Sequence, residues 1–200
     1  MGYYLRLFSP TDELPRFEDL KEAVEADAPY TLKLETGDEA DWTQLVLAHA
    51  DGTPVAMVER NPVVPGELGA DELREFLDER VADAQPASAA DWLRAYLPTV
   101  RCIYAFQVLS GADRDDGWSA LAELRLAISE TAGGIWHAED EGFTNEHGHQ
   151  ITWEFAEDVQ GPRTMAVLRD GEWVGFEMDL GNSAHREAFT RGEVPRGAKL

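Results

Sequence analysis

Cysteine, lysine and long apolar runs are scarce in this sequence. Cys102 is the one cysteine among 200 residues, so no disulfide can form within the chain. No apolar run reaches the roughly 18 residues that cross a membrane. Residues 3–8 are strand-like and lie at the position where a secretion signal peptide would have its apolar region. We therefore expect a cytoplasmic protein that does not contact membranes.

The common motifs of catalysis and phosphate binding are also missing. The chain has no Gly-x-Ser-x-Gly turn, no Walker loop and no Gly-x-Gly-x-x-Gly turn. Cys102 lies in the apolar run 102–109, which favours a buried thiol over a nucleophile. These observations favour a binding protein over an enzyme and predict no cofactor.

Carboxylates dominate the charge of the chain, with 39 Asp and Glu against 17 Lys and Arg, a net charge of −22. A field of this sign repels phosphate backbones and anionic lipids, so we expect no nucleic acid or membrane partner. It attracts a basic protein. Four carboxylates at spacings of 3, 4 and 4 form a row along the predicted helix 71–84, and this row is a candidate docking surface: Glu72, Glu75, Glu79 and Asp83. A solvated face of an acidic protein is the plainer explanation of that row.

Two segments of similar sequence, residues 45–59 and 164–178, lie 119 positions apart. Each copy predicts a β-hairpin, closed by Asp51-Gly52 or by Asp170-Gly171 in a type I′ turn. The same offset aligns strand-like residues that precede each hairpin. The pattern predicts an internal duplication.

The hydrophobic periodicity predicts an α+β fold of two tandem strand-helix-three-strand modules, with antiparallel sheets and helices packed on one face. We expect a single compact body over 1–200, in which repeats 1–84 and 101–200 are joined by the helical segment 85–100. The predicted strands are 2–8, 30–36, 43–50, 54–60, 102–109, 149–155, 163–169 and 173–179, with an additional strand and turn within 135–148. The predicted helices are 17–26, 71–84, 89–97, 116–132 and 183–190. This order resembles the tandem modules of effector-binding transcription regulators, which implies a small-molecule cleft between the two halves.

Three histidines fall in segment 135–149, which has no counterpart in the first half: His137, His147 and His149. Histidines two apart on a strand share a face and can ligate one metal ion. The spacing from Gly142 through the histidines to Glu154 is similar to the first cupin motif, but no second cupin motif follows. The alternative interpretation is a polar turn at the tip of a hairpin.

Five tryptophans lie on predicted strands or helices, at positions that favour packing in the core: Trp42, Trp118, Trp136, Trp153 and Trp173. The alternative is that some of them line a ligand cleft. The helix 89–97 is expected to bury Trp92 and Tyr96. Together the patterns predict a non-catalytic, acidic, cytoplasmic binding protein whose partner is a basic protein or a small molecule held between the halves. The alternative is a metal-dependent enzyme that uses the histidines of 135–149.

Overall fold

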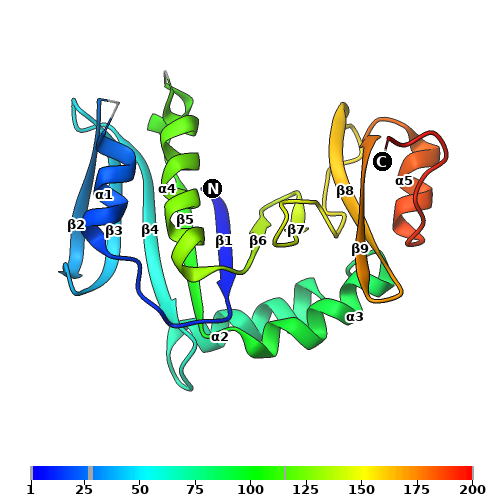
Figure 1. Cartoon of the computed structure of the whole chain (residues 1–200), viewed down its shortest axis with the longest axis horizontal. Coiled ribbons are helices and arrows are strands. Elements are labelled where there is room, and N and C mark those ends of the chain that lie inside the picture. Colours follow the sequence, from blue (N-terminus) through cyan, green and yellow to red (C-terminus); the bar gives the residue numbers. More distant parts are fainter. Residues whose placement is uncertain (1, 27–28, 115, 200) are drawn as a thin grey trace. The chain divides into compact units, whose positions relative to one another are not determined.

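The computed structural model describes residues 2–26, 29–114 and 116–199 (Figure 1). Helices and antiparallel strands are mixed along these residues, so the predicted α+β class is confirmed. None of the helices in these ranges is both long enough and apolar enough to span a bilayer.

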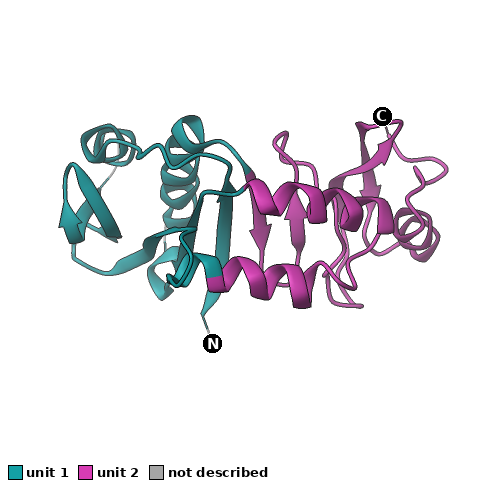
Figure 2. Cartoon of the chain, turned by 90° about the horizontal axis from the view of Figure 1, so that it is seen from below, with its two compact units in different colours: residues 1–70, 100–134 teal, residues 71–99, 135–200 magenta. Residues whose placement is uncertain are grey.

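The chain forms two compact units (Figure 2). Unit 1 comprises residues 1–70 and 100–134, and unit 2 comprises residues 71–99 and 135–200. Each unit therefore draws on both halves of the sequence. These boundaries differ from those of the repeats, and the duplication stays a prediction.

Unit 1 holds an antiparallel sheet in the order β2-β3-β4-β5-β1. Its elements are β1 (Tyr3–Ser9), α1 (Phe17–Glu25), β2 (Tyr30–Asp38), β3 (Asp41–His49), β4 (Pro54–Pro62), β5 (Cys102–Val108), a 3₁₀ turn (Ser110–Asp113) and α4 (Gly117–Ala132). The continuous apolar run of β5 is typical of a strand that is covered on both faces. Phe106 of β5 is fully buried and pairs with Leu5 of β1 and Val58 of β4.

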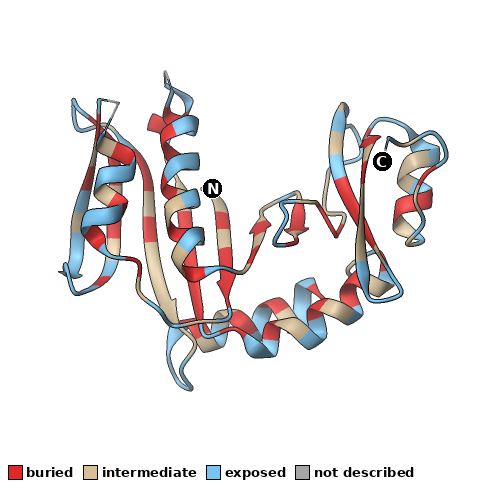
Figure 3. Cartoon of the chain, viewed as in Figure 1, coloured by how far each residue is buried: buried red, intermediate tan, exposed pale blue. Residues whose placement is uncertain are grey.

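Two helices cover one face of this sheet, as both views show (Figures 1 and 2). Helix α1 packs against β2 and α4, and α4 also contacts β4. Buried stretches alternate with exposed ones along both helices (Figure 3), as expected for amphipathic helices on a sheet. The core side of α1 consists of Phe17, Leu20 and Val24.

The two predicted hairpins differ in their turns. Asp170 and Gly171 have φ of 51° and 87°, so the type I′ prediction fits this hairpin. Of the other pair only Gly52 has positive φ, and a loop of 50–52 is closed by the N–H of His49 donating to Thr53 O at 2.9 Å. The type I′ prediction is wrong there. The reason is that the Asp51 carboxylate accepts the Thr53 N–H at 2.9 Å, which favours an Asx turn over positive φ at Asp51.

Unit 2 consists of short helices and two β-hairpins. Its elements are α2 (Leu68–Glu75, which begins in unit 1), a π-helical turn (Phe76–Arg80), α3 (Ala87–Tyr96), a 3₁₀ turn (Leu97–Thr99), β6 (Ile135–Ala138), β7 (Gly142–Thr144), β8 (Pro162–Arg169), β9 (Glu172–Asp179) and α5 (Ser183–Thr190). Hairpin β8–β9 and helix α5 share a buried core around Met165, Phe176 and Phe189. Asn182 caps α5 by accepting the N–H groups of Ala184 and His185.

The strand predicted over 149–155 is wrong. Gln150 alone forms β-bridges there, antiparallel to Thr144 and parallel to Met165. The next N–H groups turn to different partners, since Ile151 donates to Phe143 O and Trp153 to Gln85 O. A strand needs one continuous neighbour, and this segment has none.

The helix predicted over 71–84 is also not one regular α-helix. Helix α2 ends at Glu75, and the Val81 N–H donates to Phe76 O, five residues earlier, at 2.9 Å. A π-helical turn is wider than an α-helical one. The predicted row from Glu72 to Asp83 is therefore not a straight ridge on one helix.

Candidate functional site

His137 of β6 is held in a closed aromatic environment within unit 2. Its side chain is 1% exposed, because alternation along β6 turns Ile135 and His137 inward. The ring centroid lies 4.9 Å from that of Phe76 and 4.7 Å from that of Phe143. Phe76 comes from the π-helical turn, and such turns are frequent at functional sites.

Glu154 is the polar partner of this histidine. Nε2 of His137 lies 3.1 Å from each carboxylate oxygen of Glu154. An ionised carboxylate only accepts hydrogen bonds, so Nε2 carries the shared hydrogen. Arg80 lies 3.9 Å from the same carboxylate but is half exposed. The arrangement orients the imidazole, while the two phenyl rings enclose it.

His147 and His149 lie on a loop that Asn145 organises. The Asn145 side-chain oxygen accepts the N–H groups of both histidines, at 3.1 and 3.0 Å. The His149 ring lies against β9, where a Cβ added to Gly175 would approach it to 2.6 Å. His147 is exposed and 4.0 Å from the Glu146 carboxylate.

The structure brings two of the three predicted histidines together. The His147 and His149 ring centroids are 6.2 Å apart, whereas His137 pairs with Glu154. Within the described part of the chain, no three His, Cys, Asp or Glu side chains are grouped to hold a metal ion. A metal site at these histidines therefore stays a prediction.

Buried polar atoms without partners gather in the same segment. The atoms are His137 Nδ1, Asn145 Nδ2, His149 Nδ1 and Gln150 Oε1, which find no hydrogen-bond partner among the described residues. Folded proteins satisfy most such atoms, so each exception calls for a physical explanation, and a functional role is one of them. Segment 137–150 is therefore the candidate functional region, and the role predicted for its histidines stays a prediction.

Beside this region lies a partly exposed group of aromatic rings, which we call the aromatic patch: Trp92, Tyr96 and Trp173. Trp92 and Tyr96, one turn apart on α3, stack with centroids 4.9 Å apart and planes 12° apart. Trp173 of β9 meets Trp92 edge-on at 5.3 Å and 74°. The predicted burial of Trp92 and Tyr96 is wrong, because both side chains are only partly buried. The sequence did not show the patch, since the spacing of these residues is equally typical of a core.

Glu146 connects the histidine loop with the patch. Burial is the main cause that raises the pKa of Tyr96 to about 12, and the negative charge of Glu146 adds to it. The loop also has a geometric link to the patch, since Glu146 lies 4.0 Å from His147 and the His149 ring packs against Gly175, two residues from Trp173.

The other predicted tryptophans divide between core and surface. Trp42 is fully buried and donates its indole N–H to Pro15 O at 2.8 Å, as expected of a core residue. Trp118 is 46% exposed, so the core prediction is wrong for it. It stands in the first turn of α4, where its indole N–H donates to Asp113 at the surface.

Cys102 lies fully buried in β5 of unit 1. Burial raises the pKa of its thiol to about 11. A thiol of this kind is almost entirely protonated at neutral pH and is a poor nucleophile.

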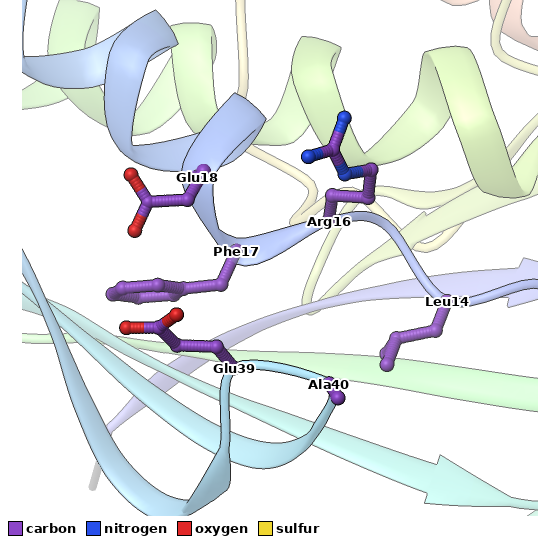
Figure 4. A pocket seen from close by; sticks show the side chains of 6 residues that line it. All are labelled: Leu14, Arg16, Phe17, Glu18, Glu39 and Ala40. Carbon is purple, nitrogen blue, oxygen red and sulfur yellow. The ribbon is translucent and has the colours of Figure 1, made fainter.

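Unit 1 also has an open groove of about 340 Å³ at the start of α1 (Figure 4). It is lined by Leu14, Arg16, Phe17, Glu18, Glu39 and Ala40. In Figure 4 the Phe17 ring lies between the Glu18 and Glu39 carboxylates, and the Arg16 guanidinium points away from Glu39. Its charged lining residues are Glu18, Glu39 and Arg16, and they include no nucleophile with a general base.

Comparison with known protein families, curated proteins and solved structures finds no match to this chain. The site must therefore be interpreted from its own geometry.

Proposed function

We propose that this protein is a non-catalytic binding protein whose partner is a basic protein. The observation that supports this is the even distribution of acidity over the fold. Unit 1 has 19 acidic residues against 8 basic ones, and unit 2 has 20 against 9, a net −11 in each case. Fields of one sign speed the encounter with partners of the opposite charge.

Two buried side chains, one in each unit, agree with binding better than with catalysis. In the candidate region His137 is enclosed by aromatic rings, and in unit 1 the Cys102 thiol is buried and protonated. The lone buried thiol also supports a cytoplasmic setting. A small molecule held between the two halves stays the other form of this proposal.

Capture from a cell extract at two salt concentrations tests the proposal. The tagged chain should retain a protein of pI above about 9 near 0.1 M salt and release it near 0.5 M, because salt screens charge pairs. Retention of the basic protein is then compared between two variants that neutralise exposed carboxylates. One is Glu75→Gln with Glu79→Gln in unit 2, and the other is the matched unit 1 variant Glu18→Gln with Glu39→Gln. Retention of no basic protein at either salt concentration would contradict the proposal.

A metal-dependent enzyme is the second candidate, supported by the adjacent rings of His147 and His149 with Glu146 at 4.0 Å from His147. Elemental analysis of the purified chain tests it. Stoichiometric metal that is lost in His147→Ala with His149→Ala would favour the enzyme. A metal-free preparation with unchanged melting on addition of zinc or manganese would remove it.

A further inference from the structure

The aromatic patch is kept apart from the core of unit 2 by the two faces of β9. Val174, Phe176 and Met178 pack with the core that α5 completes. Side chains alternate along a strand, so Trp173 and Gly175 lie on the opposite face. Trp173 therefore serves a different surface from the one that holds the hairpin and α5 together.

Trp173 has the His149 ring and Gly175 on one side and Trp92 on the other. Gly175, two residues along the same face, has no Cβ, and the His149 ring occupies that space. On the other side Trp92 stands at 74° to the Trp173 ring and is itself stacked on Tyr96. The two indole planes meet at 74°, the edge-to-face arrangement that aromatic pairs favour, and we call the place where they meet the corner.

The charge next to this corner is negative. The half-exposed Glu146 carboxylate lies 4.0 Å from His147, whose ring is 6.2 Å from that of His149, and the His149 ring fills the space at Gly175 beside Trp173. The nearby Arg94 of α3 is engaged with Asp91 at 2.7 Å and with the backbone oxygens of Val81 and Ala82. His147, at 4.0 Å from Glu146, is the basic group that the structure places beside this carboxylate.

We infer that the aromatic patch with Glu146 is the anchor site for an arginine side chain of the basic partner. The guanidinium is planar, so it stacks on indole faces, and its N–H groups match a carboxylate. Trp92 and Trp173 provide the ring surfaces, and Glu146 provides the countercharge. This inference rests on the proposed function and names the place where the partner is held.

Titration with two defined peptides, hexa-arginine and hexalysine, tests the inference by calorimetry at low salt. Wild type should bind hexa-arginine more tightly than hexalysine. Trp173→Ala should weaken hexa-arginine binding by about 3- to 30-fold, the range of a cation–π contact. Glu146→Gln should weaken it by about 2- to 5-fold.

Matched controls come from unit 1. Trp118→Ala removes another exposed indole and Glu39→Gln another carboxylate, and both should stay within about 2-fold of wild type, as expected for residues outside the contact. Trp173→Phe keeps a ring and should restore most of the affinity, which separates binding from misfolding. Near-ultraviolet circular dichroism verifies that each variant is folded.

The outcomes separate the two proposals. If Trp173→Ala and Glu146→Gln bind the peptides as tightly as the control variants do, the anchor site is overturned. The proposal of a basic partner is not affected by that result. Equal affinity for the two peptides, with no effect of Trp173→Ala, would show binding by diffuse charge and would also overturn the anchor site. Failure of wild type to bind either peptide would contradict the proposed function itself.

Discussion

Replacing Glu154 by leucine should destabilise unit 2 strongly. The imidazole of His137 is 1% exposed, lies between two phenyl rings and has Glu154 as the hydrogen-bond partner of Nε2. Losing a hydrogen bond to a charged group and leaving a buried polar atom unpaired costs about 2–3 kcal/mol. The Arg80 pair, at 3.9 Å and half exposed, should add less than about 1 kcal/mol.

Urea unfolding followed by tryptophan fluorescence and circular dichroism measures this loss. His137→Leu combined with Glu154→Leu removes both polar partners, so the double variant should lose less stability than the sum of the single variants, with a coupling of about 1–2 kcal/mol. Arg80→Ala is the control for the exposed pair. A change below about 0.5 kcal/mol for Glu154→Leu, or additive single variants, would refute the reasoning.

Three further predictions concern separate parts of the chain. Cys102, with its buried thiol of pKa about 11, should not react with a thiol reagent at pH 8 until the protein unfolds; rapid native labelling would contradict its burial. Asn182→Ala should lower the unfolding free energy by about 1 kcal/mol because α5 loses its cap, while Asn182→Asp should stay within a few tenths. The raised pKa of Tyr96 means that the unfolded chain ionises first, so its contribution to stability is complete below pH 10 and is lost as the pH rises from 10 toward 12. Glu146→Gln should lower the pKa of Tyr96 in an ultraviolet titration, and an unchanged value would remove the contact between them.

The histidine segment shows how far motif spacing leads toward a site. Its lack of a counterpart singled out 135–149, and unpartnered buried atoms gather in and next to this segment. Motif spacing could not show which of the three histidines lie together. His137 lies on β6 and pairs with Glu154, while His147 and His149 belong to the Asn145 loop. Period-two alternation assigns a face to a side chain only where a strand exists, and 149–155 is not a strand.

Local chemistry let the sequence by itself determine the α+β class, the helix from Ser183 to Thr190 and the turn at Asp170-Gly171. Periodicity, caps and turn residues act within a few positions, so they are legible without knowledge of the fold. Tertiary structure alone decided that β5 lies between β4 and β1, and that Trp92 meets Trp173. These contacts join residues far apart in the chain, and the pairing of distant segments depends on packing and backbone hydrogen bonds that no local pattern specifies.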